Sequence, residues 1–228
     1  MPSRTIGAGR AGGIRRQRAL ETRRRVVRAA YELFCRRGFA ATTMNQIAAE
    51  AGVAVQTLYF TFGTKGAILG EALGAAVVGF DEWTPPPADL PPDGETLTDL
   101  LPWHDEFHAA REPRRALGVF VENGTAILSR VGPLFAAMLA AVADPETAAA
   151  IVLAERRRVE SYRHVAATLA RTGGLRSGVD EDRAADLLLV LFSPEVYQAL
   201  SAGRGWPHEE CQRFFADVLS QQLLAPDR

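Results

Sequence analysis

Three glycines, at positions 38, 52 and 63, divide part of the N-terminal half of the chain into pieces too short to be stable alone. Thr42 and Thr43 offer hydroxyls that can cap the start of a helix ending before Gly52. A second short helix is expected between Gly52 and Gly63. Isolated helices of this length are marginal in water, so both must pack against longer neighbours.

The sequence supplies a longer helix on either side of these two pieces. The first is predicted from Gln17, with apolar residues at three- to four-residue spacing, and Gly38 ends it in the position expected of a C-terminal cap. The short helix after Gly52 is predicted over residues 55–61, and Thr64 can cap a fourth helix from Lys65 to near Phe80. The predicted arrangement is helix, tight turn, helix, braced on both sides. Its buried contacts are expected from Ile47, Val53, Leu58 and Phe62.

A proline-rich segment follows. Residues 83–94 read WTPPPADLPPDG, with five prolines, and no helix can pass through them. We interpret this segment as a loop or domain boundary. Beyond it the pattern is helical to the end, with breaks predicted at Gly132-Pro133, Asp144-Pro145, residues 173–178 and residues 203–207. No strand-like alternation or internal repeat is visible, so the fold class is predicted to be all-α.

Composition limits the classes of function. The chain has 228 residues, 47% hydrophobic and 23% charged, as expected of a globular protein. Without a run of about 18 apolar residues, neither a transmembrane helix nor a membrane partner is expected. The basic N-terminus lacks the apolar stretch of a secretory signal. Two distant cysteines, Cys35 and Cys211, fit reduced thiols and a cytoplasmic protein.

Charge is distributed unevenly along the chain. Residues 1–65 contain twelve arginines or lysines and three acidic residues, a net charge of +9. The remaining residues carry 14 basic and 24 acidic residues, a net charge of −10. A polyanion would be attracted to the first part and repelled by the second. On charge alone, a solvated arginine-rich tail explains this pattern as well as a nucleic-acid site does.

The segment from Thr22 to about Leu73 contains a set of residues at fixed spacing: Ala30, Leu33, Phe34, Gly38, Phe39, Thr42, Thr43, Ile47, Ala48, Gly52, Val53, Leu58, Tyr59, Phe62 and Lys65. With these residues at this spacing, the segment resembles the TetR family of bacterial transcriptional repressors. The stretch AADLLLVLFSPEVYQALSAGRGW near the C-terminus is similar, more weakly, to the final helices of an actinobacterial-type branch of that family. One departure is Ala54, where the family often has a serine that caps the recognition helix.

The resemblance implies a domain plan and a function. Residues 1–16 are expected to form a basic disordered arm, residues 17–66 a helix-turn-helix DNA-binding domain, and residues 67–228 a helical effector-binding and dimerisation domain. The implied function is a ligand-responsive repressor that binds a palindromic double-stranded DNA operator as a homodimer. A small hydrophobic effector of unknown identity would release it. The resemblance implies neither an enzyme nor a cofactor.

The helix over residues 55–61 is the predicted reading element. Leu58 and Phe62 lie four residues apart and should point to the core, which leaves Val55, Gln56, Tyr59 and Phe60 on the other faces. An amide such as that of Gln56 suits adenine in the major groove, and Val55 or Phe60 can contact a thymine methyl group. Tyr59 as a core aromatic is the alternative.

Other candidates concern the DNA backbone. The resemblance implies phosphate contacts for Tyr59, with Thr43 and Lys65 beside it, each of the latter two near a helix N-terminus that favours anions. Thr57 fits either a phosphate contact or a local helix bond. The arginines of residues 10–18 and 23–28 are expected to add backbone or minor-groove contacts.

The second domain offers fewer signals. Asn123 interrupts an apolar run and must face solvent or find a buried partner. His104 and His108 lie one helical turn apart, a spacing that can bind a metal, but no third ligand is apparent and no metal is expected. The candidates for an effector pocket, each of which also suits a packing role, are Trp103, Phe107, Phe120, Asn123, Phe135, Met138 and Tyr162.

Dimerisation is predicted through the last two helices, placed at residues 182–201 and 207–224, with Pro194 kinking or interrupting the first. Paired with a symmetry mate, they would form a four-helix bundle. The predicted interface residues are Leu187, Leu188, Leu191, Phe214, Phe215, Val218 and Leu219.

Two rival functions remain: an enzyme, supported only by the histidine pair and a pocket, and a dimeric scaffold that has lost DNA binding.

Overall fold

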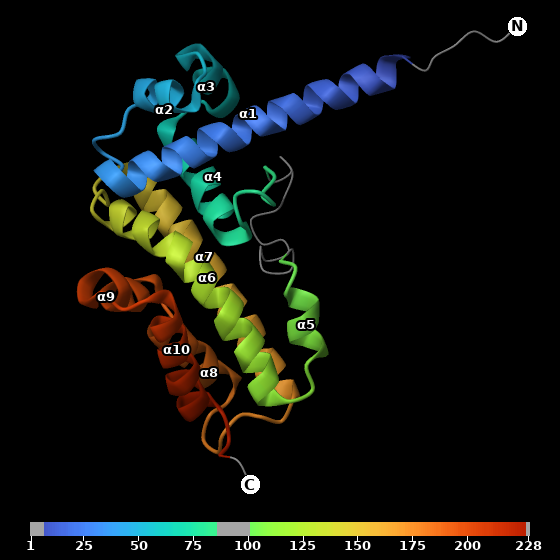
Figure 1. The fold of residues 1–228 in the computed structure, drawn as a ribbon. Coiled ribbons are helices and arrows are strands. Elements are labelled where there is room, and N and C mark those ends of the chain that lie inside the picture. Colours follow the sequence, from blue (N-terminus) through green and yellow to red (C-terminus); the bar gives the residue numbers. More distant parts are fainter. Residues whose placement is uncertain (1–6, 86–100, 227–228) are drawn as a thin grey trace, which may run out of the picture.

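The computed structural model describes residues 7–85 and 101–226 of the chain, and over these residues the protein is all-α, as predicted (Figure 1). The β-type pairing described there is an isolated bridge between Leu175 and Leu224. The helices are α1 (Gly7–Arg37), α2 (Met44–Ala51), α3 (Val55–Phe62), α4 (Lys65–Val78), α5 (His104–Ala109), α6 (Pro113–Leu139), α7 (Pro145–Arg171), α8 (Glu181–Leu191), α9 (Pro194–Arg204) and α10 (His208–Leu223).

The short helices α2 and α3 lie at one end of the molecule against α1 and α4 (Figure 1). The long helices α6 and α7 run away from this end as a pair, with α5 along one side and α8, α9 and α10 along the other (Figure 1). We call α1 to α3 together with the start of α4 the head. Of the described helices, none is both long and apolar enough to cross a lipid bilayer.

Local sequence explains how the head folds. Thr43 caps α2 in a reciprocal capping box, in which its hydroxyl accepts from the Gln46 N–H while its own N–H donates to the Gln46 side chain. Gly52 ends α2 with φ of 67°, a left-handed conformation that favours glycine. Ala54 begins α3 without a side-chain cap, as its missing hydroxyl predicts.

The head has its own core, and a second core fills the far end. Val27, Phe34, Ile47 and Leu58 are fully buried in the first, as expected for Ile47 and Leu58, and Phe62 packs against it half-buried. The first core also receives two residues of α6, Leu134 and Met138. The second core joins α5 to α10. Because α6 contributes to both cores, the head is packed onto the rest of the chain rather than tethered to it. The boundary at residue 66 stays a prediction.

Most of the predicted helix breaks are confirmed. Asp144 caps α7, which begins at Pro145, and Ser193 caps α9, which begins at Pro194. The segment predicted as one helix over residues 182–201 is therefore split into α8 and α9. The breaks predicted at residues 173–178 and 203–207 fall between helices. Most of the proline-rich segment 83–94 lies outside the described residues.

Two expectations about helix extent are wrong. Helix α6 continues through Pro133, where a break was predicted, because the buried residues Val131, Leu134 and Phe135 flank that proline and hold the helix in place. Helix α1 begins at Gly7 rather than near Gln17, so the arm expected up to residue 16 is helical from residue 7. This extension contains four glycines beside three arginines and two alanines, and the low helix propensity of glycine is why the sequence predicted an arm there.

Candidate functional site

One face of α3 is unusually exposed for its composition. Phe60 has 93% of its surface accessible and Tyr59 has 56%, and Gln56 and Thr57 are also exposed. Leu58, on the opposite face, is completely buried in the head. The alternative reading of Tyr59 as a core aromatic is therefore wrong. Tyr59 and Phe60 therefore expose aromatic surface side by side on α3.

The geometry of α3 suits a groove of duplex DNA. A major groove admits one α-helix, and the exposed residues of α3 combine an amide, hydroxyls and aromatic surface. Gln56, Tyr59 and Phe60 lie within two turns of one helix and can reach a common surface. Val55 is half-buried and packs on the head core, so it offers less surface than predicted.

Lys65 has a structural role that the sequence did not predict. Its ammonium group donates to the carbonyl oxygens of Phe39 at 2.8 Å and Thr42 at 2.9 Å, and it lies 4.1 Å from the centre of the Phe39 ring. Burial lowers the pKa of Lys65 below its ordinary value, although Asp144 and Glu146 oppose that effect. Two of its three N–H donors are thus used within the head, which leaves one for a phosphate.

The N-terminus of α4 was predicted to attract a phosphate, but a carboxylate of the chain already lies there. Glu146, from the first turn of α7, accepts a hydrogen bond of 2.8 Å from the backbone N–H of Gly66. The hydroxyl of Thr64 accepts from the Ala67 N–H. These contacts satisfy two of the N–H groups that favour an anion at a helix start. The joint between α4 and α7 is therefore internal, and a phosphate role for Lys65 stays a prediction.

Thr43 keeps the position predicted for it. It is exposed, and its hydroxyl oxygen accepts a hydrogen bond from Gln46, so the hydroxyl hydrogen stays available to an acceptor such as a phosphate. Its neighbour Thr42 is instead fully buried, and the Thr42 hydroxyl donates to the Gly38 carbonyl at 2.8 Å. Of the two predicted capping threonines, only Thr43 caps α2.

The arginines of residues 23–28 divide into two groups. Arg23 forms a two-pronged ion pair with Glu71 of α4, Arg24 donates to the Trp83 carbonyl at 2.7 Å, and Arg28 pairs with Asp81 at 2.7 Å. These side chains fasten α1 to α4 and the segment after it, and DNA contacts from this stretch stay a prediction. Arg25 is exposed.

A groove between α1 and α3 contains the better-placed basic residues. Arg16 and Arg18 of α1 line it together with Thr57 and Thr61 of α3. Both arginines are exposed. This grouping of basic and hydroxyl side chains beside the outward face of α3 is suited to a sugar-phosphate backbone.

An apolar cavity of about 180 Å³ lies between α4, α6 and α7, with Trp103 and Phe192 also on its wall. Four of the predicted effector residues line it: Trp103, Phe120, Phe135 and Tyr162. Leu73 and Val77 of α4 were not predicted, because nothing in the sequence of that helix distinguishes the cavity side from ordinary core.

The other three predicted effector residues do not line this cavity. Phe107 and Met138 are fully buried in the two cores. Asn123 is half-buried, and its amide donates to the Val119 carbonyl of its own helix at 2.8 Å, so its partner is local. These three predictions are corrected: all three residues serve packing or the α6 backbone.

The predicted dimer residues also separate by burial. Leu188, Phe215 and Leu219 are completely buried within the protomer and cannot form an interface. Four members of the set are half-buried on α8 and α10: Leu187, Leu191, Phe214 and Val218. Val190, which was not predicted, is 67% exposed on α8, three residues after Leu187. The period of helix α8 explains the split, since only one of its faces meets the core.

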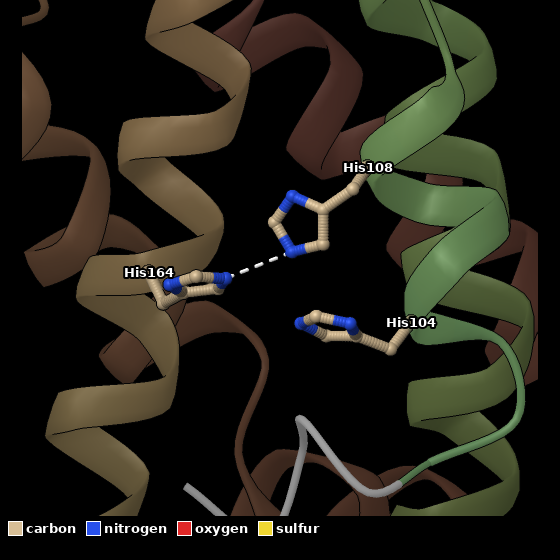
Figure 2. A group of neighbouring side chains, drawn as sticks. All are labelled: His104, His108 and His164. Atoms are coloured by element: carbon tan, nitrogen blue, oxygen red, sulfur yellow. Dashed lines mark hydrogen bonds between the residues drawn. The ribbon is translucent and has the colours of Figure 1, made fainter. Parts of the chain in front are cut away.

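The structure brings a third histidine to the predicted pair. His164 of α7 lies against His104 and His108 of α5, and one ring nitrogen from each of the three falls within 4.8 Å of the others (Figure 2). His164 was missed because it is 56 residues from His108 in sequence and has no neighbouring ligand residue.

A helix-turn-helix head with an exposed third helix, joined to a helical domain with an apolar cavity, defines a class of DNA-binding transcriptional regulators. Residues 26–72 match the family model described as bacterial regulatory proteins, tetR family. The matched residues run from α1 into α4, so the head is of the TetR type.

Solved structures share the whole fold at low sequence identity. A transcriptional regulator from Saccharomonospora viridis in complex with choline has 22% identity and a TM-score of 0.64, with 90% of this chain and 99% of that chain covered. NalD of Pseudomonas aeruginosa, described as the secondary repressor of the MexAB-OprM multidrug efflux pump, has 18% identity and a TM-score of 0.62, over 91% and 98% of the two chains. No curated protein sequence matches the chain significantly.

The stabilising role of the Lys65 hydrogen bonds is tested by mutation. We expect Lys65→Met to lower the free energy of unfolding by about 1–3 kcal/mol, because two buried carbonyl acceptors lose a charged donor. Chemical denaturation measures the change. Arg25→Met, which removes an exposed cation from the same head, is the control and should leave stability nearly unchanged. If Lys65 serves only a phosphate, both variants will be equally stable and only the salt dependence of DNA binding will fall.

Proposed function

We propose that this chain is a repressor that binds a palindromic operator as a homodimer and leaves it when a small, mainly apolar effector enters the cavity between α4, α6 and α7. The observation that carries this proposal is that one helix, α4, contributes both to the cavity and to the head. That helix forms part of the cavity wall through Leu73 and Val77, and at its other end Lys65 is bonded to the turn that precedes α2.

In this proposal α3 is the helix that reads bases. Gln56 offers an amide to adenine, and Phe60 offers apolar surface to a thymine methyl group. Tyr59, Thr43 and the groove that contains Arg16 would position the head through the sugar-phosphate backbone. The positive charge of residues 1–65 favours association with DNA at low salt.

DNA binding is tested with a fragment from upstream of the protein's own gene, in a shift assay at several salt concentrations. We expect Gln56→Ala to weaken specific binding by roughly 5- to 150-fold, the equivalent of about 1–3 kcal/mol for a bidentate base contact. Tyr59→Phe, which removes one phosphate donor, should weaken specific and non-specific DNA alike.

Gln221→Ala is the matched control, because it removes the same amide from an exposed position on α10. It should bind the fragment as the unchanged protein does. Absence of a shift at every salt concentration, or equal binding by the Gln56 and Gln221 variants, would contradict a base-reading role for α3.

The cavity favours a small effector with an apolar body. Most of its wall is aliphatic or aromatic, and its polar side includes Glu155 and Arg158. Arg158 donates to Glu155 at 2.7 Å and to the Leu189 carbonyl at 3.1 Å, and its Nε is buried without a hydrogen-bond partner among the described residues. An effector carrying an acceptor group at one end would satisfy that nitrogen. The choline complex of the S. viridis regulator supports binding of a small molecule in this fold.

Effector release requires that the ligand favour a state with low operator affinity. An effector that enlarges the cavity between α4, α6 and α7 would move α4. The hydrogen bonds of Lys65 would transmit that movement to the turn before α2. The joint at Glu146 and Gly66 opposes this movement, because it holds the start of α4 against α7. The effector must therefore supply enough differential binding energy to open or shift that joint.

A thermal-shift screen of small apolar compounds identifies effectors. We expect a true effector at about 100 times its dissociation constant to add about 2.7 kcal/mol of stability, a rise of roughly 5–10 °C in melting temperature for a chain of this size. The same compound should weaken the DNA shift. Ala154→Trp, on the cavity wall, should abolish both effects.

Ala149→Trp is the control on the same helix, at an exposed position outside the cavity. It should respond to the compound as the unchanged protein does. A compound that stabilises the Ala154 variant equally does not occupy this cavity, and one that stabilises the protein without changing DNA affinity is not an effector.

Dimerisation is proposed through the outer faces of α8 and α10. Leu187, Leu191, Phe214 and Val218 are half-buried there, and Val190 is exposed, so one face of these helices offers apolar surface beyond the protomer core. A two-fold axis through this surface would bring four helices together and place two heads on one side of the DNA. A cytoplasmic location follows from the proposed target.

The interface is tested by light scattering coupled to size exclusion. We expect the unchanged protein to elute with twice the mass of the chain and Val190→Glu to elute as a monomer, because a buried unpaired carboxylate strongly disfavours association. Val142→Glu places the same charge at an exposed valine in the α6–α7 turn and should stay dimeric. A monomeric unchanged protein, or a dimeric Val190 variant, would contradict this interface.

A further inference from the structure

Three of the four histidines of the chain meet at one place, where α5 packs against α6 and its side chains reach α7. His104 and His108 project from adjacent turns of α5, and His164 projects toward them from α7 (Figure 2). The Nε2 atoms of His108 and His164 are 2.8 Å apart, and the ring centres of His104 and His108 are 4.2 Å apart. All three side chains are half-buried.

This arrangement has the chemistry of a metal site. Neutral imidazole is a good ligand for Zn²⁺, Ni²⁺, Co²⁺ and Cu²⁺, and three imidazoles with one open position form a well-known type of zinc coordination. Two ligands four residues apart on a helix and a third from another helix converge from two directions, so an ion would cross-link the two elements. We propose that His104, His108 and His164 bind one divalent transition-metal ion.

The contact between His108 and His164 shows what metal binding would change. At 2.8 Å one Nε2 must donate a proton to the other, so the ion-free cluster is held by that hydrogen bond. Two nitrogens about 2.0–2.1 Å from a tetrahedral zinc ion are roughly 3.3 Å apart. The ion therefore replaces the shared proton and separates the two rings by about half an ångström, a change that side-chain rotation can absorb.

The side chains of Arg171 and Thr168 lie beside His108 and can adjust when His108 binds a metal ion. Arg171 approaches His108 Nδ1 at 3.3 Å and donates to the Thr168 hydroxyl at 3.0 Å, and that hydroxyl oxygen is 3.5 Å from the same Nδ1. Once His108 binds an ion through Nε2, its Nδ1 carries the proton and donates to Thr168. Arg171 must then move away from the ring, which also reduces its repulsion of the cation.

The site connects to the cavity through α5. That helix has six residues, too few to be stable by itself, and Trp103, the residue immediately before it, is on the cavity wall. Trp103 packs edge-on against Phe107 and Phe120. An ion that fastens α5 to α7 would also fix Trp103 beside the cavity. This consequence for effector binding rests on the proposed function, whereas metal binding itself does not.

Metal binding is tested by titrating the full-length, tag-free protein with Co²⁺ and following the visible absorption of the ion. We expect one equivalent per chain to give the bands of a nitrogen-ligated, four-coordinate site, and Zn²⁺ to displace the Co²⁺. His164→Gln and His104→Gln, tested separately, should each weaken binding by at least about 100-fold, since even loss of a residue that only supports a ligand costs 10- to 100-fold.

His208→Gln is the matched control, because it removes the one histidine outside the cluster. It should bind Co²⁺ as the unchanged protein does. Circular dichroism before titration verifies that each variant is folded, and the use of two single variants keeps the test valid if one of them fails to fold.

Hydrogen exchange supplies a second measurement that does not involve DNA or an effector. Addition of Zn²⁺ should slow exchange at the backbone amides of α5 in the unchanged protein and in the His208 variant, but not in the His164 variant. The proposal is overturned if the unchanged protein binds no Co²⁺ at millimolar concentration, or if loss of His104 or His164 leaves the affinity unchanged. Failure of DNA binding would leave this result unaffected.

Discussion

The ammonium group of Lys65 holds the turn before α2 against the start of α4. It is bonded to two backbone carbonyls of the turn before α2, Phe39 and Thr42, and it starts α4. Helices α2 and α3 have eight residues each and no independent stability, so their position depends on the helices around them. A charged hydrogen bond to backbone atoms transmits position more faithfully than contacts between flexible side chains. The exposed face of α3 is therefore placed by α4.

Dependence on α4 also ties the head to the cavity. Arg23 and Glu71 pair across α1 and α4, and the lower part of α4 closes the cavity against α6 and α7. A ligand that changes the space beside α4 acts on the same helix that holds the head. The coupling between the two sites is reciprocal. If DNA favours one position of α4 and a ligand favours a different position, binding of DNA must lower the affinity for that ligand.

Sequence patterns predicted the helices of the head, their caps and the inward and outward faces of α3, because these depend on local spacing and on glycine. Contacts between distant segments were not predictable in this way. Glu146 at the start of α4 and His164 beside α5 each lie many residues from their partners, and no local pattern marks them. Similarly, hydrophobicity identified apolar residues such as Met138 and Leu188 but not whether they serve the core, a cavity or an interface.

The contact of Gly66 with Glu146 leaves no clearance between α4 and α7. A β-carbon on residue 66 would lie 2.6 Å from the Glu146 β-carbon and 2.5 Å from its carboxylate oxygen, so even the smallest side chain would separate the two helices. Lys65, the adjacent residue, would be displaced with them. Under the proposed function, alanine at position 66 is accordingly expected to imitate a bound effector and to lower operator affinity when no effector is present.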